Sequence, residues 1–194
     1  YDVLDNYLTS AYNLAPYTLY EEPLAPLTGT QSQLPVILSE YRFYKISDID
    51  NYLKLLTRTP EYFRSILNFE HTKSESGLFM ASYTADSIIK ECRDFVNLKE
   101  SNYLYSSFVE RLEELASAKD GVLTEKQREA YTRQNNVYIK KYIFPAYEQL
   151  ISGLSELRSS GKNNNGLCYL PNGRTYYEYL VRSETGSSRS IAEL

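Results

Sequence analysis

The chain has 194 residues, of which 42% are apolar and 24% charged, with a formal net charge of −4 at pH 7. These values are typical of a folded globular protein and exclude a disordered chain. Basic residues are scattered among acids, which argues against a nucleic-acid partner. The apolar runs are far shorter than the roughly 20 residues of a transmembrane helix. With 20 tyrosines and no tryptophan, we expect many phenol rings to lie half-buried at a surface or cleft.

The first half of the chain alternates helical apolar spacing with proline-rich segments. Residues 1–13 place their apolar side chains on one stripe, which predicts a helix. Residues 14–33 carry three prolines and are expected to form an extended linker. A short helix is predicted over 33–43. A helix over 48–58 and another that Pro60 opens should follow, because proline is favoured at the first helical position.

The second half shows the same helical pattern over longer stretches. Thr84 is expected to cap one helix, and a second is predicted over 102–118. A capping box at Thr124 begins a long helical pattern that runs to Gly161. Within it, Pro145 cannot donate to the carbonyl of Lys141 and should kink the helix. No segment alternates convincingly, so the sequence predicts an all-α fold, an irregular multi-helix bundle with a long Pro-kinked helix.

Both ends of the sequence look cut. Ser190 and Glu193 have the spacing of a capping box, which begins a helix, yet the chain stops at Leu194. At the other end the first residue is Tyr1, and no signal peptide is recognisable. We therefore expect residues 1–194 to be a single helical domain and the amino-terminal half of a larger helical protein.

No catalytic constellation or metal site is predicted in this chain. His71 is the single histidine, and it lies among Glu70 and Lys73 on what reads as a solvated, polar helix end. A zinc helix with two histidines therefore cannot be built from these residues. Ser87 and Lys90 have the Ser-x-x-Lys spacing of serine acylating enzymes, but the partner motifs of those enzymes are missing. Chance and helix patterning explain that spacing better.

The two cysteines leave two interpretations open. Cys92 lies on an apolar helix face, which favours a buried free thiol. A disulfide between Cys92 and Cys168 would close a long loop and indicate an oxidising compartment. Two cysteines in a chain of this length fit either compartment.

The turn-rich segment 161–189 is the candidate recognition element. It combines a polar turn cluster at Asn164, Asn165 and Gly166 with a short helix over 174–182. One interpretation is a loop pinned by aromatic packing. The other is a substrate-binding cleft, in which tyrosine faces give contact area and Arg182 binds a carboxylate in a fork. Aromatic side chains at helical spacing more often belong to a core, which favours the first interpretation.

Three stretches of the chain resemble a known family. They are Gly166–Gly186, which reads Gly-Leu-Cys-x-Leu-Pro-x-Gly-x-x-Tyr-Tyr-x-Tyr-Leu-Val-Arg-x-x-Thr-Gly, Leu27–Phe43, and the Phe-Pro-Ala-Tyr stretch at Phe144–Leu150. Together they resemble the bacterial family called domain of unknown function 885, over nearly the whole chain. The resemblance implies an all-helical protein similar to zinc metallopeptidases, and a secreted protein or membrane-anchored lipoprotein.

The resemblance also implies where the chemistry lies. The family's zinc helix carries a His-Glu motif that does not occur in this chain, and in family order it would follow Leu194. This chain alone would then be no enzyme and would bind no cofactor. It would form one wall or lid of a substrate cleft, and its partners would be the rest of the polypeptide and a peptide-like substrate. Tyr176, Tyr177 and Arg182 are the expected cleft contacts, with Asn164–Gly166 at the rim. The competing hypothesis is a non-enzymatic peptide- or sugar-binding module.

Overall fold

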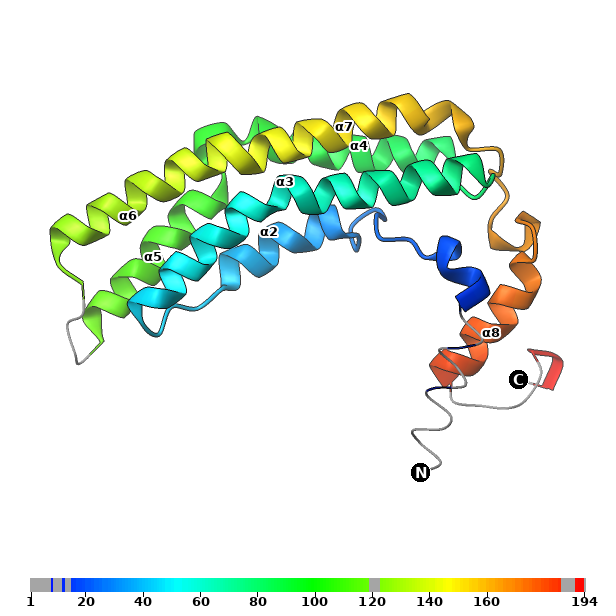
Figure 1. Ribbon diagram of the computed structural model, residues 1–194, viewed down its shortest axis with the longest axis horizontal. Helices are drawn as coiled ribbons and strands as arrows, with labels where there is room; N and C mark the ends of the chain where they lie inside the picture. Colours follow the sequence, from blue (N-terminus) through cyan, green and yellow to red (C-terminus); the bar gives the residue numbers. More distant parts are fainter. Residues whose placement is uncertain (1–7, 9–11, 13–14, 119–122, 186–190, 194) are drawn as a thin grey trace. The chain divides into compact units, whose positions relative to one another are not determined.

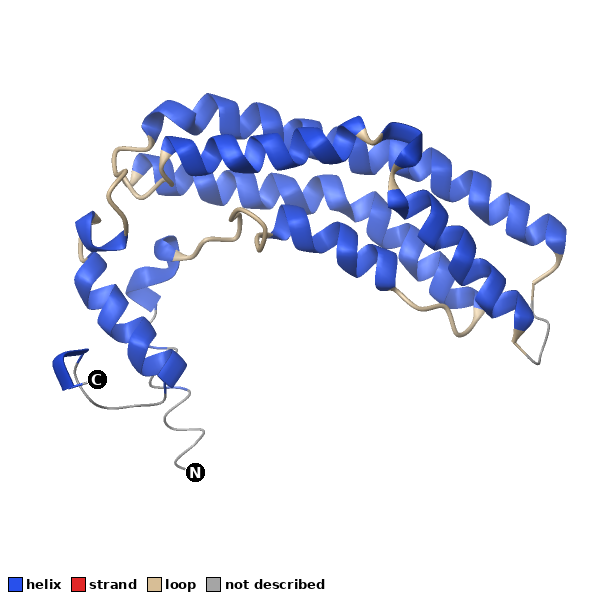
Figure 2. Ribbon diagram, turned by 180° about the vertical axis from the view of Figure 1, so that it is seen from behind, coloured by secondary structure: helices blue, strands red, loops and turns tan. Residues whose placement is uncertain are grey.

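The computed structural model describes residues 8, 12, 15–118, 123–185 and 191–193. Within that part of the chain the secondary structure consists of helices and loops, without a strand (Figure 2). The predicted all-α fold class is therefore confirmed. Most of the helix expected over 1–13, and the Ser190 cap, lie outside the described residues; Ile191–Glu193 form a 3-10 turn, η6.

The helices follow one another along the chain with short connections (Figure 1). The α-helices are α2 (Thr30–Glu40), α3 (Ile46–Glu75), α4 (Ser82–Asn97), α5 (Tyr103–Ser117), α6 (Glu125–Tyr138), α7 (Phe144–Leu157) and α8 (Gly173–Thr185). Short 3-10 helices are η1 (Ala15–Tyr20), η2 (Lys99–Ser101), η4 (Arg158–Ser160) and η5 (Leu167–Tyr169). The chain divides into two compact units, a bundle unit of residues 23–68 and 83–156 and a terminal unit of residues 1–22, 69–82 and 157–194.

The bundle unit is held together by aromatic side chains from several helices. The ring of Tyr147 on α7 packs against Phe63 of α3, with centroids 5.1 Å apart, and against Phe95 of α4, at 4.4 Å. Its hydroxyl donates a 2.6 Å hydrogen bond to the carbonyl of Gln31 on α2. A buried phenol with a hydrogen-bonded hydroxyl satisfies both its apolar and its polar part. Tyr147 thus joins α2, α3, α4 and α7 in one core.

Arg111 of α5 binds the carboxyl-terminal end of α2. Its Nη1 donates to the carbonyls of Leu38, at 2.8 Å, and Tyr41, at 2.6 Å. The guanidinium lies 4.8 Å from the ring of Phe43 and 4.9 Å from that of Tyr52. The Leu38 carbonyl lies in the last turn of α2 and the Tyr41 carbonyl directly after it. Because the last carbonyls of a helix lack helical partners, a buried cation there satisfies them and complements the helix dipole.

The break expected between two helices near Pro60 is wrong. Residues Ile46–Glu75 form one helix, α3, with Pro60 inside it. Proline removes one backbone bond, which would go to the carbonyl of Leu56. On either side of it Leu56 and Phe63 are wholly buried. Because tertiary packing of an apolar face stabilises helices more than local propensity does, α3 tolerates the lost bond.

The long helix with an irregularity at Pro145 is confirmed. The pattern from Thr124 onward folds as α6, a π-helical segment η3 (Ile139–Ile143) and α7. The amide of Phe144 bonds to the carbonyl of Ile139, a wider turn than the α-helix allows. This widening falls directly before Pro145, where the missing N–H would otherwise interrupt the α-helical ladder.

The described part of the terminal unit contains η1, the end of α3 and α8. The segment 14–33, expected as an extended linker, contains η1 and the first turn of α2. Further along, α8 begins at the predicted turn, where Asn172 has a φ of 54°. A Cβ atom at Gly173 would overlap the carbonyl of Leu167, so only glycine fits there. This close approach sets the start of α8.

Candidate functional site

A cluster of three tyrosines joins η1 to α8. The ring of Tyr176 on α8 lies 5.5 Å from that of Tyr17 and 4.9 Å from that of Tyr20, between centroids. The hydroxyl of Tyr20 donates a hydrogen bond to the carbonyl of Pro171. Tyr176 itself is only 6% exposed. The ring that the sequence analysis expected in a cleft is therefore a packing residue, because the helical period turns it toward η1.

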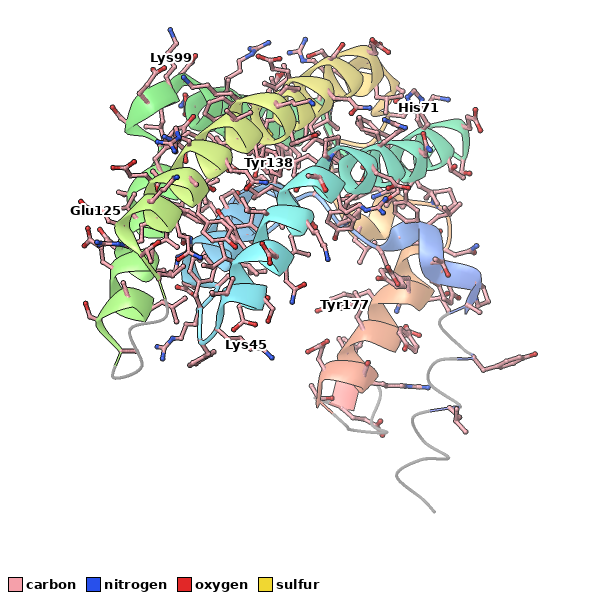
Figure 3. All side chains as sticks on the ribbon, turned by 60° about the vertical axis from the view of Figure 1, so that its left-hand side comes forward. Lys45, His71, Lys99, Glu125, Tyr138 and Tyr177 are labelled. Carbon is pink, nitrogen blue, oxygen red and sulfur yellow. The ribbon has the colours of Figure 1, made fainter. Side chains whose placement is uncertain are left out.

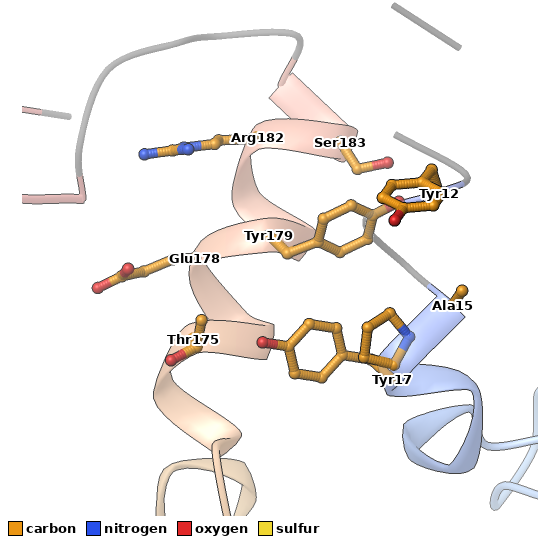
Figure 4. A pocket seen from close by; sticks show the side chains of 9 residues that line it. Tyr12, Ala15, Tyr17, Thr175, Glu178, Tyr179, Arg182 and Ser183 are labelled. Atoms are coloured by element: carbon orange, nitrogen blue, oxygen red, sulfur yellow. The ribbon is translucent and has the colours of Figure 1, made fainter. Parts of the chain in front are cut away.

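A groove lies beside this cluster, lined by η1, α8 and Tyr12 (Figure 4). We call it the tyrosine groove, and its volume is about 580 Å³. Its lining comes from the amino-terminal segment and from α8: Tyr12, Ala15, Pro16, Tyr17, Thr175, Glu178, Tyr179, Arg182 and Ser183. Its size is within the range of sites that hold small ligands.

The groove has an aromatic side and a charged edge. Figure 4 shows the ring of Tyr179 lying on the side of α8 that faces Tyr12 and Tyr17, while Glu178 and Arg182 point to the other side. Glu178 is paired with Arg174, one turn back, at 3.6 Å. In the part of the chain that the structure describes, no carboxylate forms an ion pair with the exposed Arg182. Its guanidinium is therefore accessible to an anionic ligand group.

The other predicted site residues do not line the groove. Tyr177, labelled in Figure 3, is 49% exposed and stands out from α8. Asn164 and Asn165 are exposed in the loop before η5, where Asn163 donates a 2.6 Å hydrogen bond to the carbonyl of Gly166. Gly166 has a φ of 99°, which favours glycine. The structure thus places Arg182 in the groove, and Tyr177 and the asparagine loop outside its lining.

Of the lining residues, Arg182 alone was among the predicted site residues, and eight were missed: Tyr12, Ala15, Pro16, Tyr17, Thr175, Glu178, Tyr179 and Ser183. The helical period could have found the four on α8, since positions 175, 178, 179, 182 and 183 recur every three to four residues. Nothing in the sequence could have found Tyr12 and Tyr17, because they meet α8 only through the folded chain.

A buried ion cluster lies at the end of α3 in the terminal unit. Lys73 is wholly buried, and its Nζ donates to the carbonyl of Glu21 and pairs with Oε1 of Glu22, both at 2.9 Å. Glu70, one turn back, is also wholly buried, and its Oε2 lies 3.8 Å from Nζ of Lys73. The expectation of a solvated helix end is therefore wrong for Glu70 and Lys73. Among these neighbours only His71 is exposed, as Figure 3 shows.

Burial dominates the protonation of this cluster. It raises the pKa of Glu70 to about 7, although Lys73 acts in the opposite direction and Glu22 adds to the rise. Burial also raises the pKa of Glu22, which Lys73 partly offsets. Strongly shifted groups occur at functional sites and also in structural ion clusters. Here the contacts of Lys73 with the segment after η1 indicate a structural link.

The described residues do not fit a zinc site. In those ranges no three His, Cys, Asp or Glu side chains are arranged to hold a metal ion. The Ser87 and Lys90 side chains have other partners, since the hydroxyl donates to the carbonyl of Tyr83 at 3.0 Å and the ammonium pairs with Asp94 at 2.5 Å. No catalytic step is therefore assigned to these residues.

Both cysteines are free thiols in the structure. Cys92 is buried on α4 in the bundle unit, and Cys168 is exposed in η5 of the terminal unit. Of the two interpretations that the sequence left open, the structure thus has the free thiols, and the alternative disulfide between Cys92 and Cys168 is not formed in it.

Comparison with known families decides the classification. A family model described as "Bacterial protein of unknown function (DUF885)" matches residues 1–194, the whole chain. The chain belongs to this family. No curated protein matches it.

A solved structure supports the fold of this family member. It is described as "the putative lipoprotein from Colwellia psychrerythraea", with a TM-score of 0.79 and 17% sequence identity. The match covers 88% of the present chain and 29% of the neighbour, so the chain spans less than a third of that protein's length. At this identity the likeness concerns the fold alone. No helix in the described ranges combines the length and apolarity needed to cross a membrane.

Proposed function

We propose that this chain is the substrate-contacting helical part of a larger bacterial hydrolase, and that the tyrosine groove contacts a peptide-like substrate. The observation that carries the proposal is that phenol rings and the accessible guanidinium of Arg182 line the same groove. The solved neighbour, more than three times as long as the matched part, supports a larger protein as the functional unit.

The chemistry of the groove favours a peptide with a free carboxylate. Phenol rings supply rigid contact area for apolar side chains at a small cost in conformational entropy. A guanidinium binds a carboxylate through two parallel hydrogen bonds, which are stronger than neutral ones. With Tyr17 and Tyr179 on one side and Arg182 at the edge, the groove offers both kinds of contact.

In this proposal the hydrolytic groups belong to other parts of the protein. The family resemblance implies zinc, and the residues described here do not provide its ligands. The chain's own contribution is to bind and orient the substrate. The likeness to a protein described as a lipoprotein supports a secreted or membrane-anchored location as part of the same proposal.

The alternative is a binding module without hydrolytic activity, for a peptide or a sugar. It is favoured by the groove itself, whose aromatic and polar lining brings no nucleophile and base together. Sugars stack on aromatic rings and hydrogen-bond to carboxylates and hydroxyls such as those of Glu178 and Ser183. The affinity for a sugar would depend little on the positive charge of Arg182, whereas the affinity for a peptide carboxylate would depend on it. This difference distinguishes the two ligands experimentally.

Equilibrium binding tests the proposal. The probes are phenylalanyl-alanyl-alanine with a free carboxylate, the same peptide as its amide, and maltotriose. We expect the free acid to bind about tenfold more tightly than the amide, as one charge-assisted hydrogen bond allows. Arg182→Gln should remove this preference, and Arg133→Gln in α6 should keep it. Binding of maltotriose alone would favour the sugar module, and no binding of either peptide would contradict the proposal.

A further inference from the structure

Lys73, near the end of α3, binds the segment that forms one wall of the tyrosine groove. Tyr17 lines the groove from η1, and Glu21 and Glu22 follow η1 directly. Nζ of Lys73 donates to the carbonyl of Glu21 and pairs with the carboxylate of Glu22, each at 2.9 Å. Lys73 is wholly buried, so water does not compete for its ammonium group. This ammonium therefore helps to position the wall, together with the packing of Tyr17 and Tyr20 on Tyr176.

Glu70 is a second carboxylate that can pair with the ammonium of Lys73. It is wholly buried, and neither of its carboxylate oxygens has a hydrogen-bond partner among the described residues. Its Oε2 lies 3.8 Å from Nζ of Lys73, within ion-pair range but longer than a hydrogen bond. A buried carboxylate with such weak pairing is stable when it is protonated and costly when it is charged.

We propose that Glu70 and Lys73 are positioning residues of the tyrosine groove, and that protonation of Glu70 decides how firmly Lys73 holds the groove wall. When Glu70 is neutral, the ammonium of Lys73 is directed at Glu21 and Glu22. When Glu70 is ionised, it draws the ammonium toward itself, and the contacts to Glu21 and Glu22 lengthen. The inference rests on the proposed function only in assigning ligand binding to the groove.

The direction of this competition follows from the geometry. Lys73 has three ammonium hydrogens, and two of its present acceptors lie on the η1 side. Among the described residues, the charged groups that act on the pKa of Glu70 are Lys73 and Glu22, so Lys73 is the cation available to a charged Glu70. Glu22 is 46% exposed at its side chain and can exchange Lys73 for water. The buried Glu70 cannot exchange Lys73 for water. A charged Glu70 is therefore stabilised more by pairing with the ammonium than Glu22 is destabilised by losing it.

The titration of Glu70 falls in the accessible pH range. Its pKa is raised to about 7, chiefly by burial, with Lys73 opposing and Glu22 adding to the shift. The groups packed against the cluster are Glu21 and Glu22 after η1 and Tyr176 of α8, whose pKa is raised by burial and by these two carboxylates. Tyr176 therefore stays neutral near pH 7. We expect the groove wall to loosen as the pH rises through about 7.

Hydrogen exchange of residues 15–22 tests the inference without any ligand. Wild type and Glu70→Gln are compared at each pH from 5.5 to 8.5, so that the intrinsic pH dependence of exchange cancels. Glutamine copies the neutral carboxyl group. We expect equal exchange at pH 5.5 and at least fivefold faster exchange in wild type at pH 8.5. Equal exchange at every pH would overturn the inference.

Two further variants identify the groups involved. Lys73→Met should exchange rapidly over 15–22 at every pH, with its helix content by circular dichroism showing whether the chain is folded. His71→Gln is the control, because histidine side chains titrate near neutral pH in general and His71 is exposed beside Glu70. Its hydrogen exchange over 15–22 should have the same pH dependence as that of wild type. Loss of the pH dependence in His71→Gln would assign the effect to the imidazole and overturn the role of Glu70.

Peptide binding then separates this inference from the proposed function. With phenylalanyl-alanyl-alanine as the probe, wild type should bind several-fold more weakly at pH 8.5 than at pH 5.5, and Glu70→Gln should bind equally at both. If the peptide binds with no such pH dependence, the positioning role fails and the groove assignment stands. If no peptide binds but exchange over 15–22 follows Glu70, the positioning role stands and the groove assignment fails.

Discussion

The ring of Tyr176 lies 4.9 Å from the ring of Tyr20, between centroids, and so joins α8 to the segment η1 near the start of the chain. Tyr20 is fixed in turn by its hydrogen bond to the carbonyl of Pro171, just before α8. The two walls of the tyrosine groove therefore share one aromatic base. Groove shape and the stability of the terminal unit should depend on the same buried ring.

Tyr176→Ala should destabilise the terminal unit by about 3 to 5 kcal/mol, as for other buried aromatic side chains. The neighbouring Tyr177→Ala removes an exposed ring and should change stability by less than about 0.5 kcal/mol. Hydrogen-exchange protection of α8 measures the stability change in each of the two variants. Equal losses in the two variants would contradict the assignment of Tyr176 to the packed side of α8.

Arg111→Met should destabilise the bundle unit by about 2 to 5 kcal/mol, because it leaves the buried carbonyl of Leu38 and the half-buried carbonyl of Tyr41 without this donor. The matched control is Arg133→Met on α6, whose ion pair with Glu129 at 3.4 Å is exposed on both sides. Its loss should cost less than about 0.5 kcal/mol. Urea denaturation followed by circular dichroism gives both values, and a wild-type midpoint for Arg111→Met would refute the role of Arg111.

The stability of the terminal unit should fall as the pH rises from about 5 to 8. The pKa of Glu70 is about 7 in the folded chain, above its ordinary value of 4.5, so the folded state binds the proton more tightly than the unfolded state. The resulting stabilisation is complete below the unfolded pKa and is lost as the pH rises through the folded one. Its size is on the order of 2 to 3 kcal/mol.

The Glu70→Gln variant provides the comparison for this pH effect. Its terminal unit should show the same exchange-derived stability at pH 5 and pH 8, apart from effects shared with wild type. Two results would contradict the titration of Glu70 in the folded chain. One is a wild-type stability that rises from pH 5 to pH 8, and the other is a wild-type stability with the same pH dependence as that of Glu70→Gln.

Thiol titration should find two free cysteines of very different reactivity. Cys168 is exposed and should react with Ellman's reagent within minutes. Cys92 is buried, and burial raises the pKa of its thiol to about 12, with Glu91 adding to the effect, so it should react only on unfolding. Cys168→Ser should lose the fast phase alone. A chain without free thiols in denaturant would establish the disulfide instead.

Local patterns in the sequence predicted local structure well. The capping box at Thr124 is present, with the amide of Thr124 donating to Oε1 of Gln127 at 2.9 Å and the amide of Gln127 donating back at 3.3 Å. The irregularity at Pro145 also follows from the missing N–H. At Pro60 the same rule failed, because burial of Leu56 and Phe63 outweighs one absent hydrogen bond.

The candidate site could be predicted only in part. Arg182 was expected in a cleft and lines the groove, since its own helix places it there. Tyr176 was expected beside it and is buried, because the outcome depends on η1, a segment that no local pattern connects to α8. Glu70 and Lys73 look like a solvated helix end in sequence. Both are buried, and Lys73 contacts Glu21 and Glu22, which only the folded chain brings near it.

The most direct test of the groove assignment is photo-crosslinking with mapped sites. The probe is benzoylphenylalanyl-alanyl-alanine with a free carboxylate, irradiated with the 194-residue chain and analysed by peptide mass spectrometry. Crosslinks confined to residues 12–17 and 175–183, and lost on competition with the unlabelled tripeptide, are the predicted result. Competed crosslinks that map to the bundle unit, or crosslinks that the tripeptide does not displace, would contradict the assignment of ligand binding to the tyrosine groove.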